Sequence, residues 1–318
     1  MKNTYLPEGA LLSTAENQEY ISSLSGLERA MVDGRILEAT VSLCDSTFRL
    51  HVDLGGICGI IEREETVFCR TGESIKDIAI ITRVGKPVAF KVKGFKRENG
   101  RIVATLSRRA AQEECQNHFL SALCSGDIIP AKVTHLESFG AFVDIGCGLS
   151  SLLTVDNISV SRISHPRDRL SVGDSVYVVI KSRDEAGERL YVSMKELLGT
   201  WKQNADMFEV GQTVSGIIRS IEDYGVFVEL APNLAGLAEI REDTRDAEIA
   251  KVGATTAVYI KSIIPDRMKI KLILIDAYRG TPIEKKLNYF VDCENERHIK
   301  SWKYSPPNAP KTVETIFD

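Results

Sequence analysis

The sequence predicts a mainly β protein made of three small closed barrels joined by helices. Two observations support this prediction: one unit recurs along the chain with the same residues at matching offsets, and each copy contains about five short β-rich runs separated by turn residues. Between the copies, apolar residues change to a spacing of three and four, which is typical of helices. Five short strands per copy favour a sheet that closes on itself.

Two copies of the unit are clear. In one, Gly126 begins the first β-rich run, and Asp144 ends the motif Phe-Gly-Ala-Phe-Val-Asp. In the other, Gly211 and Glu229 are separated by the same offset, and Glu229 ends the motif Tyr-Gly-Val-Phe-Val-Glu. Each copy continues with a Val-Gly pair and closes on a basic residue and a further strand.

A weaker third copy lies upstream, where Gly34 begins the first run and Asp53 follows at an offset longer by one position. The Val-Gly pairs of the three copies start at Val84, Val172 and Val252. Their separation is well above the roughly 20–45 residues of a solenoid repeat, so it suits a small domain that is repeated.

Three segments outside the barrels are predicted to be helical. Residues 14–32 should begin at Ser13 or Thr14 and end at Asp33-Gly34. Residues 106–124 and 194–208 lack proline and are rich in helix formers, so we expect linker helices there. The predicted organisation is a helical arm at 1–33, barrels at 34–107, 125–193 and 210–276, linkers at 108–124 and 194–209, and an irregular C-terminal appendix at 277–318.

The composition excludes several classes of protein. Forty Lys and Arg against 44 Asp and Glu give a net charge of −4, which excludes a uniformly cationic nucleic-acid coat. No apolar run approaches the roughly 18 residues that a membrane-spanning helix needs, and the N-terminus shows no export signal. The seven cysteines are an odd number without a Cys-x-x-Cys pair, which suits a reducing compartment. We therefore expect a cytoplasmic protein without a membrane partner.

The clearest functional candidates are two matched pairs of aromatic residues, Phe139 with Phe142 and Tyr224 with Phe227. In a regular strand, Phe142 and Asp144 share one face while small and branched residues take the other, so the ring of Phe142 should point outward. Phe139 reaches the same surface only if Gly140 permits a kink or bulge. Two exposed rings form a stacking surface for unpaired bases. The alternative is that one or both rings fill the barrel.

The ordered string Gly-x-x-Val-x-Gly/Ala, Phe/Tyr-Gly-x-Phe-Val-Asp/Glu, Val-Gly and Arg-Ile-x-Val-Ser resembles the S1 RNA-binding domain, an OB-fold repeat. The resemblance covers the chain from Gly34 to about Asp276, and it is strong for the ordered set as a whole. The array, with its weaker first copy, is similar to the shorter ribosomal S1 homologues of Gram-positive bacteria. The resemblance implies three tandem OB-fold five-stranded barrels, of which the second and third bind RNA.

The RNA surface of that family has two aromatic residues, a His after the third strand, and an Asp and an Arg near the final hairpin. By this resemblance the basic position corresponds to Arg189 and Lys269, and the acidic one, less closely because hairpin lengths differ, to Asp184 and Asp266. The His has no counterpart here, because its positions are occupied by Thr154 and Glu239, and of these two we expect only Thr154 to contact RNA.

The first copy departs further from the family pattern. Phe48 remains, but Arg49 replaces the glycine and His51 replaces the second aromatic residue. We therefore expect this barrel to dock to a protein or to its neighbour.

Charge does not favour RNA binding by the barrels as wholes. Residues 126–195 and 211–272 each carry eight basic and nine acidic residues, a net charge of −1. Binding must then depend on local placement, as in the loop 159–169, where three arginines accompany one aspartate. The expected phosphate contacts are Lys132, Arg162, Arg167, Arg169, Lys181 and Lys261.

The function that the sequence supports best is non-catalytic binding of single-stranded RNA, and the resemblance implies mRNA binding at the small ribosomal subunit. No motif for a nucleophile, a metal, a cofactor or a small-molecule substrate is present. Two alternatives remain open at this stage. The chain could regulate RNA turnover or transcription away from the ribosome, or it could be a protein-binding scaffold.

Overall fold

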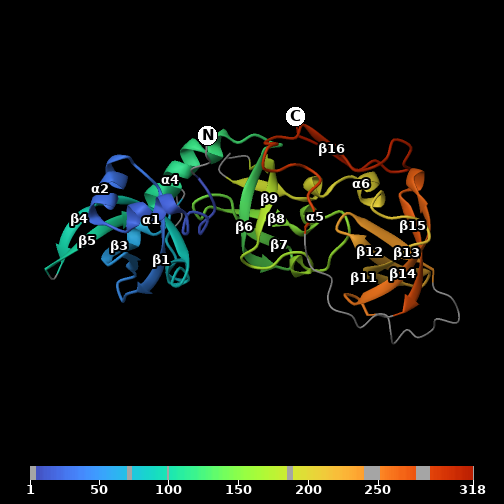
Figure 1. Ribbon diagram of the computed structural model, residues 1–318, viewed down its shortest axis with the longest axis horizontal. Coiled ribbons are helices and arrows are strands. Elements are labelled where there is room, and N and C mark those ends of the chain that lie inside the picture. Colours follow the sequence, from blue (N-terminus) through green and yellow to red (C-terminus); the bar gives the residue numbers. More distant parts are fainter. Residues whose placement is uncertain are drawn as a thin grey trace. The chain divides into compact units, whose positions relative to one another are not determined.

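The computed structural model describes residues 5–69, 74–98, 100–184, 189–239, 251–276 and 287–317. The strands of this part of the chain form three closed barrels of five strands each, so the predicted mainly β class is confirmed (Figure 1). By spatial contacts the chain divides into two compact units. The first contains the residues up to Leu123 together with Pro130–Lys132 and Val143–Ser151, and the second contains the remaining residues from Cys124 onward.

The first barrel consists of β1 (Leu37–Cys44), β2 (Leu50–Leu54), β3 (Ile57–Ile61), β4 (Pro87–Glu98) and β5 (Arg101–Ser107), with the short helix α3 (Asp77–Ile81) before β4. The strand order is β1-β2-β3-β5-β4. Neighbouring strands are antiparallel except β3 and β5, which run parallel with Cys58 beside Val103. The inward side chains of the alternating strands, among them Val41, Leu54 and Phe90, form its buried core.

The second barrel consists of β6 (Ile128–Glu137), β7 (Gly140–Asp144), β8 (Ser150–Thr154), β9 (Ser175–Arg183) and β10 (Leu190–Ser193), and α5 (Val155–Ile158) follows β8. The third consists of β11 (Thr213–Glu222), β12 (Gly225–Ala231), β13 (Leu234–Ala238), β14 (Thr255–Ile264) and β15 (Lys269–Asp276). Both repeat the strand order of the first barrel. The parallel pair recurs as well, with Leu152 beside Tyr191 and Leu237 beside Lys271.

The N-terminal arm contains two helices where the sequence predicted one. Thr14 caps α1 (Ala15–Ile21) as expected, but a second helix, α2 (Leu24–Val32), begins after Ser23. Ser23 has extended backbone angles, and its hydroxyl accepts the N–H of Gly26, so it acts as a new N-cap. The predicted end at Asp33-Gly34 is found, with Gly34 in the left-handed region at φ 64°.

Helices also lie in both predicted linkers, although each is shorter than expected. Ser107 caps α4 (Arg108–His118), and a 3-10 turn follows at Leu120–Ala122. In the other linker, a 3-10 turn at Lys195–Leu198 and α6 (Trp201–Ala205) are separated by Gly199, whose φ of 82° ends the first turn. No described helix has the length and apolar character needed to cross a membrane.

The described C-terminal residues, 287–317, pack within the second unit. A two-stranded sheet of β16 (Ser301–Lys303) and β17 (Glu314–Ile316) carries Trp302, which is buried with Tyr304 and Trp201 against the core of the third barrel. Phe317 is buried with Ile128 of the second barrel. The rings of Trp302 and Tyr304 are therefore part of the core of this unit and are not exposed for stacking.

Candidate nucleic-acid interface

The turn between β6 and β7 presents two aromatic rings. Phe139 is 52% exposed, and Phe142 is half-buried on the outer face of β7. Their centroids lie 6.1 Å apart with the ring planes at 89°, an edge-to-face arrangement, so both rings belong to one surface. Their neighbours Ala141 and Val143 point inward and are buried.

Gly140 allows this arrangement through close backbone packing. It is buried, and a Cβ placed on it would lie 2.5 Å from the carbonyl oxygen of Leu153 on β8. No side chain fits there without moving the backbone of β8. The glycine of the motif therefore keeps β7 close to β8, and the two rings remain on the outside.

The third barrel repeats the same geometry independently. Tyr224 is 63% exposed, and its ring meets that of Phe227 at 6.2 Å and 90°. A Cβ on Gly225 would lie 2.7 Å from the carbonyl oxygen of Ala238. We refer to the pairs Phe139 with Phe142 and Tyr224 with Phe227 as the ring pairs.

His135 adds a third ring in the second barrel, which the sequence analysis did not predict. Its imidazole stacks on Phe142 at a centroid distance of 6.3 Å and an interplanar angle of 30°. Its side chain is 62% exposed, and its Nε2 lies 2.7 Å from the Glu137 carboxylate. The sequence could have indicated this contact, because His135 on β6 lies opposite Phe142 on the neighbouring strand β7, and cross-strand neighbours share one face of a sheet.

The predicted phosphate contacts of the second barrel differ in their accessibility. Arg162 and Arg167 are exposed in the loop after α5, and Arg167 also contacts His165. Lys181 is exposed, although its ammonium donates a hydrogen bond to Asn157 at 3.0 Å. Lys132 is half-buried, and its ammonium donates to the carbonyl oxygen of Glu8 in the N-terminal arm at 3.1 Å. The ammonium group of Lys132 therefore already has a partner within the protein.

The expectation for Arg169 is wrong. Its side chain is only 5% exposed and forms an ion pair with Glu229 of β12, which is 4% exposed. Arg219 of β11 also donates to Glu229 at 2.7 Å and lies 3.4 Å from Asp168. The loop of the second barrel is therefore joined to the third barrel by buried charges, and the guanidinium of Arg169 cannot reach a phosphate in solution.

Asp144, which matches Glu229 in the repeat, is likewise buried and bound by other residues of its own unit, the first. Its carboxylate accepts hydrogen bonds from the backbone N–H groups of Gly146, Gly148 and Glu8 at 2.7 to 3.0 Å. Burial and the neighbouring Glu8 carboxylate raise the pKa of Asp144 to about 7. Asp144 therefore does not remain exposed beside Phe142 as a strand pattern alone would suggest, because the N-terminal arm covers it.

The other predicted RNA-binding positions either form contacts within their own barrel or are exposed. The Asp184 carboxylate accepts the backbone N–H of Arg189 at 3.0 Å across that hairpin. Thr154 is half-buried, and its hydroxyl accepts the amide of Asn157 at 2.8 Å. In the third barrel, Lys261, Asp266 and Lys269 are exposed. Glu239, at the position of the family's His, lies 3.6 Å from Lys271.

The corresponding turn of the first barrel is occupied by its own contacts. The ring of Phe48 packs against the core, with the guanidinium of Arg63 at 4.8 Å from its centroid. Arg49 and His51 both bind the Asp45 carboxylate, at 2.9 and 3.0 Å. The hydrogen bond from His51 is the main cause of a pKa of Asp45 well below its usual range. The expected loss of an open stacking surface here agrees with this geometry.

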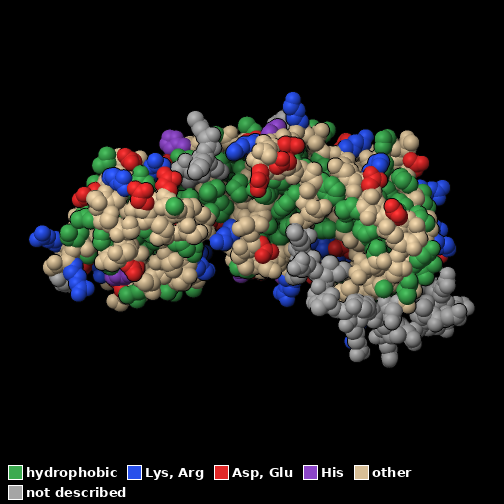
Figure 2. Space-filling model, viewed as in Figure 1, with side chains coloured by type: hydrophobic (Ala, Val, Ile, Leu, Met, Phe, Trp, Pro, Cys, Tyr) green, Lys and Arg blue, Asp and Glu red, His purple; other side chains and the backbone are tan. Residues whose placement is uncertain are grey.

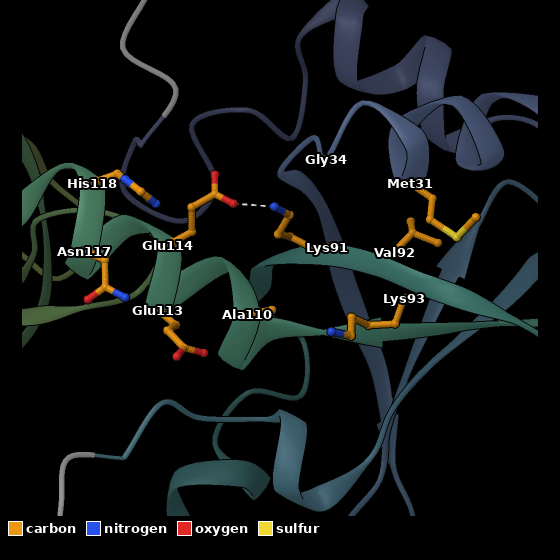
Figure 3. A pocket seen from close by; sticks show the side chains of 10 residues that line it. All are labelled: Met31, Gly34, Lys91, Val92, Lys93, Ala110, Glu113, Glu114, Asn117 and His118. Atoms are coloured by element: carbon orange, nitrogen blue, oxygen red, sulfur yellow. Dashed lines mark hydrogen bonds and ion pairs between the residues drawn. The ribbon is translucent and has the colours of Figure 1, made fainter.

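A pocket of 480 Å³ lies in the first unit beside α4 and β4, apart from the ring pairs. Figure 3 shows the side chains of Lys91 and Glu114 pointing toward one another, and the two form an ion pair. Lys93 and Glu113 add one further charge of each sign. The described residues that line the pocket include His118 but no Phe, Tyr or Trp, so it lacks the paired rings of a base-stacking site.

The described residues contain no group of three or more His, Cys, Asp or Glu that could hold a metal ion. On the face shown in Figure 2, basic and acidic side chains of the described residues are interspersed, with no continuous basic stripe. The exposed ring pairs are the strongest candidate site in the described part of the chain.

Part of the chain matches a known family, and longer stretches are similar to named proteins. Residues 124–195 match the S1 RNA binding domain family. The small ribosomal subunit protein bS1 of Staphylococcus aureus (strain COL) is 29% identical over 278 residues, which cover 83% of this chain and 67% of that protein. For the bS1 protein of Staphylococcus epidermidis, the identity is 33% over 209 residues, 62% of this chain and 52% of that protein.

Among solved structures, the crystal structure of a multidomain protein with nucleic acid binding domains from Streptococcus pneumoniae covers 79% of this chain and 76% of its own. Its sequence identity is 14% and its TM-score 0.25, a likeness too weak to bear on the fold or the function.

Proposed function

We propose that the chain binds single-stranded RNA through its two ring pairs and catalyses no reaction on it, because residues 124–195 match the S1 RNA binding domain family. The observation that carries the proposal is the duplication: the two pairs have centroid distances of 6.1 and 6.2 Å and nearly perpendicular planes. Rings displayed on a barrel surface suit unpaired bases, because the faces of bases in a duplex are covered by the neighbouring base pairs.

Charge in the two barrels suits a modest affinity for the RNA backbone. Arg162, Arg167 and Lys181 are exposed in the second barrel, and Lys261 and Lys269 in the third. If about three phosphates are neutralised per barrel, the logarithm of the binding constant should fall with the logarithm of salt concentration with a slope near −2 per barrel. Tethering of two barrels on one strand then raises the overall affinity above that of either barrel.

We further propose that the bound RNA is mRNA and that binding occurs at the small ribosomal subunit in the cytoplasm. The support is the relation to proteins named small ribosomal subunit protein bS1 over 83% of the chain. Sedimentation of the purified chain with small subunits tests this part separately. If the chain stays in the supernatant at low salt while it still binds free RNA, the ribosomal role is wrong and a regulator away from the ribosome is favoured.

The decisive test of RNA binding replaces all four rings, Phe139, Phe142, Tyr224 and Phe227, by Ala. Fluorescence anisotropy with an unstructured oligouridylate then measures the affinity. We expect a loss of at least about 100-fold, because each stacked base contributes about 1–3 kcal/mol. The rings are outside the cores, so the circular dichroism spectrum should stay unchanged. An unchanged affinity would show that the ring pairs do not bind RNA and would leave a protein-binding scaffold as the better interpretation.

A further inference from the structure

Beside the ring pairs, the second barrel carries a histidine where the third carries a serine. Positions 135, 139 and 142 of the second barrel correspond to positions 220, 224 and 227 of the third, with a constant offset. Ser220 lies directly across the strand pair from Phe227. His135 occupies the matching place beside Phe142 and stacks on it, whereas Ser220 has no ring to contribute.

The imidazole of His135 is held in a defined orientation. Thr134, its neighbour on β6, donates its hydroxyl to the carbonyl oxygen of Phe142 at 3.0 Å, which joins the two strands at this point. The Glu137 carboxylate can only accept, so Nε2 of His135 carries the hydrogen in their 2.7 Å contact. In the neutral ring, Nδ1 is then an acceptor that this contact leaves unused.

Phe142 contacts both of the other rings. Its centroid lies 6.3 Å from that of His135 and 6.1 Å from that of Phe139. Both distances are within the range of favourable aromatic contacts. Because His135 and Phe139 are both more than half exposed, the second barrel offers a surface of three connected rings, and the third barrel offers two.

We propose that His135 is an RNA-contacting residue, whose imidazole gives the second barrel a place for one more unpaired base than the third. The inference rests on the proposed RNA binding. It predicts that the second barrel has a higher affinity for RNA than the third. The ligand chemistry is that of a single-stranded nucleotide: the base lies against the face of the imidazole, and the ribose 2′-hydroxyl can donate to Nδ1 at the ring edge.

The test isolates the second barrel within the full chain. In a background that carries Tyr224→Ala and Phe227→Ala, the change His135→Ser gives the second barrel the residue of the third. We expect the affinity for an unstructured oligouridylate to fall about fivefold, the lower end of the range for one stacked base, because the imidazole is small and exposed. The change His135→Phe keeps a ring without the contact to Glu137 and should retain most of the affinity.

The reciprocal change supplies the matched control. In a background that carries Phe139→Ala and Phe142→Ala, Ser220→His places an imidazole beside Phe227 and should raise the affinity of the third barrel by a similar factor. The slope of affinity against salt should stay the same in all these variants, because a stacked base releases no counterions. A role of His135 as a phosphate contact would instead reduce that slope.

The outcomes separate this inference from the proposed function. If His135→Ser has no effect while removal of the four rings abolishes binding, the chain binds RNA but His135 takes no part, and the inference is overturned. If His135→Phe loses as much affinity as His135→Ser, stacking is not its role and the inference also falls. If the wild-type chain binds no RNA, the proposed function itself fails.

Discussion

The first and second barrels have the same strand order and a corresponding turn between their first two strands. The turn of the second barrel exposes two aromatic rings, whereas the side chains in the turn of the first barrel bind one another. In the second barrel, Phe139 and Phe142 lie on the surface, and Gly140 lies against β8. In the first, Arg49 stands in place of the glycine, and its guanidinium and the ring of His51 both bind Asp45. We expect the residue between the aromatic positions to determine whether the rings are displayed or the turn is occupied by its own contacts.

Polar side chains of the first barrel and of α4 bind the N-terminal arm. Glu38 of β1 is buried, and its Oε2 accepts the backbone N–H groups of Gly9 and Leu11 at 2.9 Å each. Arg108 binds the Glu8 carboxylate through Nε and through a terminal nitrogen, at 2.6 and 3.0 Å. The first barrel and α4 therefore hold the N-terminal arm, to which Lys132 and Asp144 of the second barrel also bind, but of these two barrels the second displays a pair of aromatic rings to solvent.

The largest expected effect compares the two turns directly. The double change Phe139→Ala and Phe142→Ala should weaken RNA binding by about 2–4 kcal/mol, because two bases lose their stacking partners. The corresponding change in the first barrel, Phe48→Ala and His51→Ala, should leave the affinity unchanged. Anisotropy titrations of both variants at one salt concentration measure the difference. Equal losses in the two variants would show that the turn of the first barrel also binds RNA.

The second prediction concerns the glycine of the open turn. Gly140→Ala should destabilise the second barrel by about 2 kcal/mol, because the new Cβ meets the carbonyl oxygen of Leu153 and the Cα of Thr154, which are both backbone atoms. Hydrogen exchange of the β7 and β8 amides measures the local loss of protection. Gly94 on β4 is the matched control, since its Cβ would have only an ordinary contact, 3.5 Å from Thr105. Equal effects at the two glycines would contradict this explanation.

The third prediction tests how the first barrel holds the arm. Burial raises the pKa of Glu38 to about 7, even though two backbone N–H groups bind its carboxylate. The Oε1 atom of Glu38 is buried without a hydrogen-bond partner among the described residues, so it can carry the proton. The folded first unit therefore binds a proton between pH 4.5 and 7 that the unfolded chain releases, and its stability must fall as the pH rises through this range.

Between pH 6 and pH 8 the contribution of Glu38 should amount to about 1 kcal/mol of lost stability. Asp144, whose pKa is also raised to about 7, acts in the same direction. Urea unfolding at the two pH values measures the total, and Glu38→Gln should make the difference smaller. Glu28→Gln is the control, because Glu28 is exposed on α2. A pH dependence that is the same in Glu38→Gln and in the wild type would refute the role of this carboxyl group.

The barrels and the ring pairs could be predicted from sequence because they depend on residues close together in the chain. Alternation along β7 places Phe142 outward, and the repeat shows that the arrangement is used twice. The burial of Arg169 could not be predicted, because its partner Glu229 lies 60 residues away in another barrel. The same holds for Asp144, which is covered by an arm that precedes it by 136 residues. His135 could not be found from the motif Phe-Gly-Ala-Phe-Val-Asp, because it lies outside that motif on the preceding strand and meets Phe142 only through the pairing of β6 with β7.

The smallest expected effect is a gain of function in the first barrel. Arg49→Gly with His51→Phe restores the motif Phe-Gly-x-Phe, removes two of the groups that bind Asp45, and frees the backbone between the aromatic positions. We expect only about a threefold gain in affinity for single-stranded RNA, below the value of one fully stacked base, because Phe48 stays packed on the core beneath Arg63. The variant should be measured with all four rings of the other barrels replaced by Ala, so that any binding comes from the first. The single change His51→Phe, which keeps Arg49, is the control and should give no gain. If it gives the full gain, the aromatic ring decides whether the turn is open, and the glycine does not.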